Sequence, residues 1–308
     1  MARANASSKE PREPSKTKAY VEILRPVNCT FGALTVLIGI LNAMDPAAVF
    51  STVNGWLAVI GGLVVYFFVA GAGNVINDYF DAAIDKINRP NRPIPRGDIE
   101  KERAIRYFIN LGAIATTLAV IVAIMTPNWL LIPASTVFFI FIGYAYARWG
   151  KPSGFPGNLM VGVSFSFGIP FGAFYVVGLP SIPPAIWFFF ATSACLLISR
   201  ELVKGMEDME GDRKFNIKTV ANTRGTKAAA IVSIVFSAGA IVAFTLPAFY
   251  LLSSIAFDIL MILGNIAVVI SICLLLRGRD AKKNQKFSSL MLKAGAFIGL
   301  VAYVLASL

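Results

Sequence analysis

The chain has 308 residues, of which 56% are hydrophobic, and its mean hydropathy is +0.69. It contains no histidine, which excludes Ser–His–Asp and Cys–His catalysis, histidine-bound zinc or haem, and a histidine general base. Any metal must therefore have oxygen ligands, a set that favours magnesium or manganese. The net charge of +11 would suggest a nucleic-acid partner in a soluble protein, but its distribution along this chain indicates a different role and no nucleic acid.

Apolar stretches long enough to cross a bilayer follow one another from residue 20 to the end of the chain. Residues 1–18 instead form a polar tail that is expected to be disordered and has no apolar core of the kind found in signal peptides. No soluble domain is left over, so residues 19–308 are predicted to form a single all-α integral membrane domain. The nine predicted spans lie at about 20–44, 56–84, 104–125, 128–147, 157–177, 184–204, 226–246, 255–276 and 288–307.

The distribution of lysine and arginine predicts how this bundle is oriented. All 28 lie in the N-terminal region, in every second loop after it, or at the helix ends that flank those loops. The acids on the opposite side are Asp45 and Asp258. By the positive-inside rule, the N-terminus is predicted to be cytoplasmic and the C-terminus outside, in a multi-pass protein of the cell membrane. Most of the basic residues are explained as topology determinants that also attract anionic lipid.

The end of the second predicted span carries a stripe of acids and amides. At 100° per residue, Asn74, Asp78, Asp81 and Asp85 fall within an arc of about 60°, and Asn77 lies just beside it. Carboxylates are costly beside hydrocarbon, and at a helix C-terminus they also oppose the macrodipole. A solvated helix end is the structural alternative, but the cost favours a function: binding magnesium and, through it, a diphosphate.

The loop after this stripe, RPNRPIPRG at residues 89–97, alternates arginine with residues that restrict the backbone. Such a stiff loop pre-positions the guanidinium groups of Arg89 and Arg92, which can hold phosphate oxygens bidentately. The loop between predicted spans 4 and 5 adds Tyr146, Lys151 and Asn158. For any single basic residue here, topology determination is the alternative explanation.

A second acidic cluster ends the sixth predicted span and repeats the spacing of the first. Glu201, Gly205, Asp208 and Asp212 have the same i, i+4, i+7, i+11 separation, and Gly211 is expected to end the helix before Asp212. One charged helix end is common. Two matched stripes, each followed by basic residues, favour a functional site on the cytoplasmic face.

The segments NDYFDAAIDKINRPNRPIPRG, YARWGK and EDMEGD resemble the UbiA superfamily of intramembrane prenyltransferases. The resemblance covers nearly the whole chain and implies nine helices around a central cavity that opens sideways to the bilayer. It also implies two magnesium ions that bind an isoprenyl diphosphate between the aspartate motifs; no obligate protein partner is evident. The residues that match the family's metal ligands are Asn77, Asp81, Asp85, Asp208 and Asp212.

The same resemblance assigns roles to the residues around the metal. Those expected to carry catalysis are Asp81, Asp85, Asp208, Asp212, Lys151 and Tyr146. Those expected to contact substrate are Asn74, Asn77, Asp78, Arg89, Arg92, Asn28, Arg25, Asn158, Lys204 and Glu201. Many members have an acid where this chain has Gly205. The second magnesium is therefore expected to be held more loosely, or Glu201 or Glu207 is expected to replace the missing acid as a ligand.

Three short segments, LRPVNC at 24–29, RELVK and EDMEGD, are most like the archaeal members that make digeranylgeranylglyceryl phosphate. This implies transfer of a geranylgeranyl group from its diphosphate to the free hydroxyl of geranylgeranylglyceryl phosphate, a lipid-like acceptor of archaeal ether-lipid synthesis. Asn28, close to Arg25, would lie near the acceptor; an interhelical hydrogen bond is the alternative. An aromatic acceptor of quinone or haem synthesis stays open. A transporter with an acidic ion site is disfavoured, because the acids gather at one membrane face.

Overall fold

The computed structural model describes residues 16–214, 217–252 and 254–307, and every regular element in these ranges is a helix. The predicted all-α class is therefore confirmed for the described residues. Most of the predicted tail, residues 1–15, lies outside them. Its last three residues, Lys16–Lys18, are part of a helix rather than of a disordered segment.

Eight helices in the described ranges are long and apolar enough to cross a membrane. They are α2 (Pro26–Ala43), α4 (Val53–Asn88), α5 (Lys101–Ala123), α6 (Leu131–Ala145) as continued by the turns η1 (Tyr146–Gly150) and η2 (Lys151–Ser153), α9 (Pro184–Glu207), α11 (Val220–Tyr250), α12 (Ile255–Gly278) and α13 (Lys282–Ala306). The shorter elements are α1 (Lys16–Leu24), α3 (Pro46–Phe50), α7 (Phe155–Ser166), α8 (Gly168–Ala173), η3 (Leu179–Ser181) and α10 (Met209–Lys214).

Two predicted spans are each divided into two helices, and proline explains both breaks. The span predicted at 20–44 is broken at Arg25, whose φ of 54° and ψ of 63° lie in the left-handed region, directly before Pro26. The span predicted at 157–177 becomes α7 and α8. Here Pro170 has no N–H for the carbonyl of Ser166, and α7 ends at Ser166.

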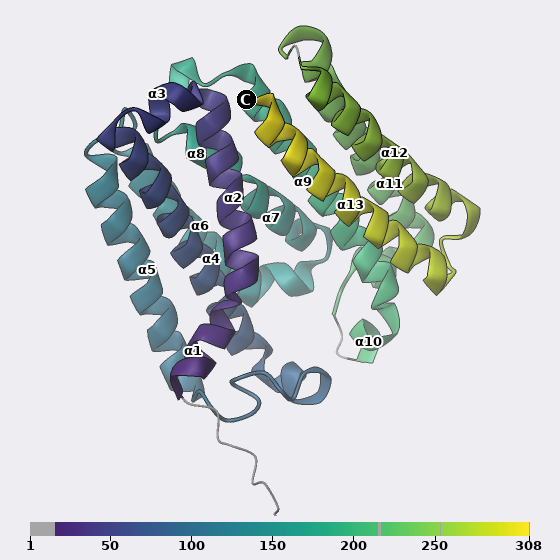
Figure 1. Cartoon of the computed structure of the whole chain (residues 1–308). Coiled ribbons are helices and arrows are strands. Elements are labelled where there is room, and N and C mark those ends of the chain that lie inside the picture. The colour runs from purple at the N-terminus through teal and green to yellow at the C-terminus, as the bar shows by residue number, and fades with distance from the viewer. Residues whose placement is uncertain (1–15, 215–216, 253, 308) are drawn as a thin grey trace, which may run out of the picture.

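The helices form two groups with α7 and α8 between them, as Figure 1 shows: α2, α4, α5 and α6 on one side, and α9, α11, α12 and α13 on the other. The backbones of α2 and α8 touch, because a Cβ atom on Gly39 would lie 1.9 Å from the carbonyl oxygen of Ile169. At the same end of the molecule α2 also reaches α13, where Asn42 Nδ2 donates to the carbonyl of Tyr303 at 2.9 Å. Near that contact the two groups of helices pack against each other.

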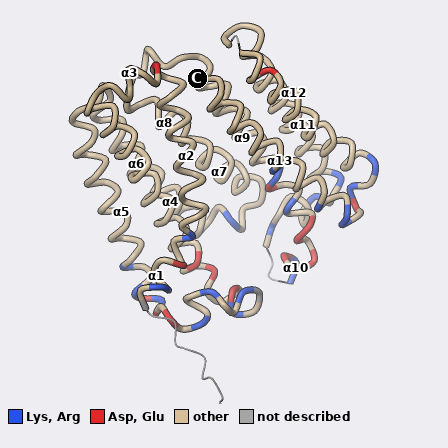
Figure 2. The backbone as a smooth tube through the Cα atoms, in the orientation of Figure 1, with Lys and Arg blue, Asp and Glu red and all other residues tan. Residues whose placement is uncertain are grey.

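The charged residues gather at the opposite end, around α1 and α10, called here the charged end. Among the described residues, the other end, called here the uncharged end, carries no charged residue except Asp45 and Asp258 (Figure 2). Helix α4 has 36 residues and is therefore about 54 Å long, well beyond the ~30 Å of a hydrocarbon core. The C-terminal part of α4, from Asn74 to Asp85, carries the predicted acid stripe. The chain begins its described part at the charged end and reaches its C-terminus at the other (Figure 1).

Candidate active site

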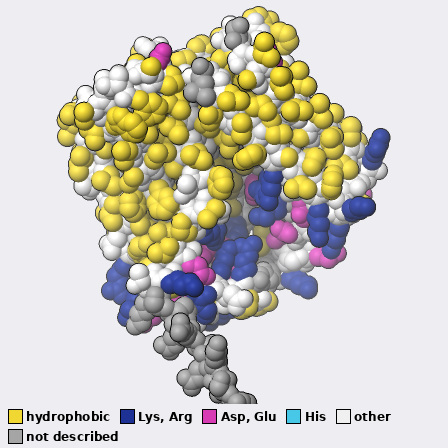
Figure 3. All heavy atoms as spheres, viewed as in Figure 1, with side chains coloured by type: hydrophobic (Ala, Val, Ile, Leu, Met, Phe, Trp, Pro, Cys, Tyr) yellow, Lys and Arg dark blue, Asp and Glu magenta, His cyan; other side chains and the backbone are white. Residues whose placement is uncertain are grey.

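A cavity of about 780 Å³ lies between α4, α6, α7 and α9 and extends to the charged end of the molecule. Its polar part is lined by carboxylates and cations, and its other part by aromatic rings such as Phe139 and Phe167. Figure 3 shows the molecule hollowed on one face, with charged side chains inside and hydrophobic side chains around them. A site of this shape suits an amphiphile with an anionic head and an apolar tail.

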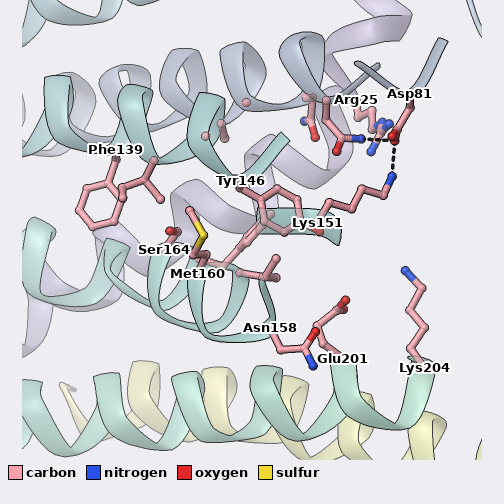
Figure 4. A pocket seen from close by; sticks show the side chains of 18 of the residues that line it. Arg25, Asp81, Phe139, Tyr146, Lys151, Asn158, Met160, Ser164, Glu201 and Lys204 are labelled. Carbon is pink, nitrogen blue, oxygen red and sulfur yellow. Dashed lines mark hydrogen bonds and ion pairs between the residues drawn. The ribbon is translucent and has the colours of Figure 1, made fainter. Parts of the chain in front are cut away.

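The cavity brings together nearly all of the predicted site residues. The six expected to carry catalysis, Asp81, Asp85, Asp208, Asp212, Lys151 and Tyr146, all line it. So do Asn74, Asn77, Arg89, Arg92, Arg25, Asn158, Lys204 and Glu201 from the expected substrate contacts. In Figure 4, Asp81 and Lys151 lie on one side, and Glu201 and Lys204 of α9 point toward them from the other. Residues from distant parts of the sequence thus face one space.

Asp78 and Asn28 are the two predicted substrate contacts that do not line the cavity. Asp78 is only 2% exposed and lies behind the wall, where its carboxylate pairs with Arg25 and Arg92. Asp78 therefore anchors these two arginines, which themselves line the cavity. Asn28 is exposed on α2, and among the described residues it makes no side-chain hydrogen bond to another helix.

The first acidic cluster is held by cations of the protein itself. Arg92 Nη1 donates to Asp78 Oδ1 at 3.0 Å and also pairs with Asp85. Lys151 Nζ pairs with Asp81, whose Oδ2 also accepts from Asn77 Nδ2 at 3.0 Å. Buried carboxylates need such partners, because an unpaired charge taken out of water costs several kcal/mol. The predicted stripe on one helix face is therefore confirmed as a set of spatial neighbours.

The break before α2 explains how Arg25 reaches this cluster. Asn74 Nδ2 donates to the carbonyl oxygen of Leu24 at 2.8 Å, and Cys29 Sγ donates to the same oxygen at 3.1 Å. These bonds satisfy a carbonyl at the break, while the left-handed Arg25 extends its guanidinium to Asp78. Sequence reasoning missed this role of Asn74; Pro26 was the signal that a carbonyl there would need a partner.

The loop from residue 89 to 100 is braced by one of its own arginines. Arg96 pairs with Glu22 at 2.9 Å and with Asp98, and these carboxylates raise the pKa of Arg96 above its usual range. Gly97 has a φ of 88° in this turn, a value that favours glycine. The loop is therefore braced by ion pairs of Arg96, a contribution that the prolines did not predict, and Arg89 and Arg92 lie at the cavity wall.

Tyr146 and Lys151 are placed by an irregular helix end. The last turn after α6 is a π-helix, Tyr146–Gly150, a form that often marks functional sites. Gly154 then has a φ of 78°, and a Cβ atom there would lie 2.8 Å from the carbonyl oxygen of Lys218. Only glycine fits this turn without strain, and the turn returns the chain into α7 with Asn158 at the cavity.

The second acidic cluster is built differently from what its spacing predicts. Helix α9 ends at Glu207, Asp208 follows with a φ of −91° and a ψ of 2°, and Met209 begins the separate helix α10. The predicted end at Gly211 is therefore wrong: the helix is interrupted between Glu201 and Asp212, although both still line the same cavity. The break falls at Asp208 itself, whose backbone N–H still bonds to Lys204.

The side chains of this second cluster are more open to solvent. Asp208 is exposed and Asp212 half-buried, and burial together with the nearby Asp208 raises the pKa of Asp212. Glu207 lines the cavity, and its Oε1 atom is buried with no hydrogen-bond partner in the described structure. An orphaned carboxylate oxygen in a polar cavity is an available cation ligand.

The chemistry of these donors fits magnesium, which prefers carboxylate and other oxygen ligands. The residues that could hold it are Asp81 and Asp85 on one side and Asp208 and Asp212 on the other, all at one cavity. Within the described ranges, no three acidic or cysteine side chains converge closely enough to form a ready metal cage. Lys151 and Arg92 occupy carboxylate oxygens of the first cluster instead.

The fold and the cavity thus define a multi-helix membrane protein with an acid-lined site for an amphiphile. The chain belongs to the UbiA prenyltransferase family, whose model matches residues 33–301. It is 34% identical over 301 residues to a digeranylgeranylglyceryl phosphate synthase from Thermococcus gammatolerans, covering 94% of this chain and 99% of that one. Over 293 residues it is 32% identical to the enzyme of that name from Korarchaeum cryptofilum, covering 94% and 97%.

Solved structures agree with this assignment. A structure of a digeranylgeranylglyceryl phosphate synthase superposes with a TM-score of 0.79 at 27% identity, covering 96% of this chain and 99% of that one. A UbiA homologue from Archaeoglobus fulgidus bound to DMAPP and Mg²⁺ superposes with a TM-score of 0.67 over 92% of this chain and 99% of its own. At 19% identity, the latter likeness concerns the fold alone.

Proposed function

We propose that this protein transfers a geranylgeranyl group from its diphosphate to the free hydroxyl of geranylgeranylglyceryl phosphate, with two magnesium ions at the acidic clusters. The observation that carries this is the single cavity that joins both clusters and the basic clamp to an aromatic chamber. The named relatives, which align over 94% of the chain, support the acceptor. The solved neighbour with DMAPP and Mg²⁺ supports the donor class and the metal.

We also propose nine spans, with α7 and α8 together forming the ninth, and an active site at the cytoplasmic face. An odd number of spans agrees with the chain ends, since α1 lies at the charged end and the C-terminus at the other (Figure 1). The positive-inside rule supports a cytoplasmic location of the charged end. The cell membrane is the corresponding location.

In this mechanism magnesium, when bound, neutralises the diphosphate and makes it a better leaving group. Arg89, Arg92 and Lys151 hold the diphosphate oxygens, so that its charge is balanced as the allylic C–O bond breaks. The acceptor oxygen forms the new C–O bond, and its proton leaves with the diphosphate. Aromatic walls such as Phe139 and Phe167 enclose the tail and keep water from the carbocation.

Product formation by purified protein with geranylgeranyl diphosphate and magnesium tests this proposal. Geranylgeranylglyceryl phosphate and 4-hydroxybenzoate are offered in parallel, with EDTA as the control. We expect ether product from the first acceptor alone, abolished by EDTA. Turnover only with the aromatic acceptor would keep the chemistry and reject the lipid assignment, and diphosphate-stimulated ion flux without product would identify a transporter.

A further inference from the structure

Two cations, Arg200 and Lys293, lie on helices some turns before the charged loops, and neither lines the cavity. Arg200 is on α9, seven residues before its end, and Lys293 is on α13, eleven residues after its start. At 1.5 Å per residue these positions are about 10 Å and 16 Å from the ends of their helices. Intramembrane cations are costly and usually mark a functional contact.

The hydrogen bonds of Arg200 are incomplete. Its Nη1 atom contacts Glu201 Oε1 at 3.3 Å, and no other bond of its side chain is seen in the described structure. Its Nε atom is buried and has no partner, although the side chain as a whole is 23% exposed. A guanidinium has five N–H donors, and leaving one of them buried and unpaired destabilises the protein. The donor is therefore available to a ligand.

Arg200 and Lys293 lie at the same depth. The rings of Phe189 on α9 and Tyr303 on α13 stack with centroids 3.8 Å apart, which fixes the register of the two antiparallel helices. Arg200 is eleven residues after Phe189, and Lys293 is ten residues before Tyr303. Both are thus about 15–17 Å from the stack, in the same direction. Eleven residues of an α-helix make three full turns plus about 20°. Arg200 therefore lies close to the direction of Phe189 around α9, on the side that faces α13.

Lys293 faces the hollow between α13 and α2. It is rotated about 80° from Tyr303 around α13, and about 140° from Ser288. Ser288 bonds to Ser271 of α12 at 2.6 Å, so Lys293 is on the edge turned away from α12. That edge faces α2, which packs on α13 near the uncharged end, where Asn42 bonds to the carbonyl of Tyr303. Lys293 is exposed, and no ion pair of its side chain is seen in the described residues.

This depth is where the second substrate must react. The carbon that is transferred lies deeper in the membrane than its diphosphate, and Arg200 lies eight residues, or about 12 Å, deeper than Asp208. In the proposed acceptor, the phosphate is carried on the carbon next to the reacting hydroxyl. A lipid that enters from the bilayer with its hydroxyl at the reaction centre must therefore bring a phosphate to this level.

We propose that Arg200 and Lys293 form a phosphate-binding subsite for the lipid acceptor, separate from the magnesium-bound diphosphate. This inference rests on the proposed function for the identity of the acceptor. Lys204, one turn from Arg200, lines the cavity and connects the subsite to it. Arg200 supplies the donors for the phosphate oxygens, and Lys293 supplies a second positive charge from the opposite helix. The subsite selects an acceptor with a phosphate over one without.

The test compares Arg200→Gln and Lys293→Gln with wild type, and uses Lys286→Gln as a matched control on α13 nearer the charged end. For geranylgeranylglyceryl phosphate, we expect KM to rise about 10- to 100-fold for Arg200→Gln and about 10-fold for Lys293→Gln. The KM for geranylgeranyl diphosphate and kcat at saturation should change less than about twofold. With phosphate-free geranylgeranylglycerol, wild type and variants should be alike.

A purely structural role of Arg200 predicts a different result. Loss of its contact with Glu201 would then raise the KM of the donor, or lower kcat, with both acceptors alike, and this outcome would overturn the subsite. If the Lys293 side chain only extends to the membrane surface, Lys293→Gln should have the same KM values as Lys286→Gln. That result would overturn the role of Lys293 in the subsite. Arg200→Lys should recover part of the lost affinity only if charge is recognised.

Thermal stabilisation separates this proposal from the proposed function. Geranylgeranylglyceryl phosphate should raise the Tm of wild type more than geranylgeranylglycerol does, and the two variants should lose this difference. If wild type makes no product but shows the difference, the subsite stands and the reaction assignment fails. If neither variant changes the difference, the subsite is rejected whatever the reaction proves to be.

Discussion

The two acidic clusters share a spacing in the sequence but differ in how their charge is stabilised. In the first, Asp78, Asp81 and Asp85 are at most 6% exposed, and each pairs with a lysine or arginine of the protein. In the second, Asp208 is exposed beside a helix break, and neither it nor Asp212 has a side-chain ion pair in the described structure. The carboxylates of the first cluster are thus held in place by the protein, whereas those of the second cluster are free to contact solvent or a ligand.

This difference shows that equal spacing does not impose equal structure. The first stripe lies within a continuous helix, where an i, i+4, i+7 pattern brings side chains together. The second is interrupted at Asp208, so its members are held by two separate helices. The first cluster is suited to fix the geometry of the site, and the second to adapt to the ligand.

The largest expected effect is loss of activity in both Asp81→Asn and Asp208→Asn. Each removes a carboxylate proposed to bind magnesium, and turnover should fall about 100-fold or more in a magnesium-saturated product assay. The Tm values should differ between them, because only Asp81→Asn leaves a lysine unpaired. Equal activity of wild type and Asp208→Asn would contradict a role for the second cluster.

Lys151→Gln removes one of the cations that pair with the first cluster. We expect turnover to fall about 100-fold, because a donor to the diphosphate is lost. At the same time, magnesium should bind the substrate-free protein more tightly, since Asp81 no longer has a competing ammonium. Calorimetric titration with magnesium measures this, with Lys214→Gln on α10 as the control. Weaker magnesium binding in Lys151→Gln would reject this competition.

Gly205→Asp makes the second cluster more like that of many family members. A Cβ atom at this position would meet Thr219 at 3.5 Å, an ordinary contact, so the side chain can be accommodated beside the cavity. One more carboxylate should strengthen magnesium binding about tenfold. Gly205→Ala adds the same Cβ atom without the charge, and a gain shared by both variants would show that helix stiffening, not ligation, is responsible.

We expect almost no effect at Glu210, which is exposed on α10 beside the second cluster and pairs with Lys282 at 2.7 Å. Lys282 lowers the pKa of Glu210, so the pair stabilises the fold above the ordinary glutamate pKa of about 4.3 and less as pH falls through the lowered value. Because the pair is solvated, Glu210→Gln should leave the Tm at pH 7 nearly unchanged. A shift of several degrees at pH 7 would contradict this.

The sequence predicts much of the site because its strongest signals are local. The stripe on α4 could be read from helical periodicity, and the stiff loop after it from its prolines. The breaks at Arg25 and near Pro170 also have local signals, although they were predicted as continuous spans.

Other features depend on contacts between distant residues. Asp78 was expected to contact substrate, but it anchors Arg25, which is 53 residues away in the sequence. No periodicity shows that such a partner exists. The break at Asp208 likewise falls before the glycine that was expected to cause it, and no residue type at that position signals it. The depth of Arg200 could be read from the sequence, but its unpaired Nε atom could not.

The ion pair between Lys151 and Asp81 has a consequence for the order in which ligands can act. A magnesium ion bound at Asp81 would compete with the ammonium of Lys151 for the carboxylate, and a diphosphate is an anion that could receive this ammonium. We therefore expect each of the two ligands to raise the affinity for the other by the same factor, as thermodynamic linkage requires. Magnesium alone or diphosphate alone should therefore bind more weakly than the two ligands together.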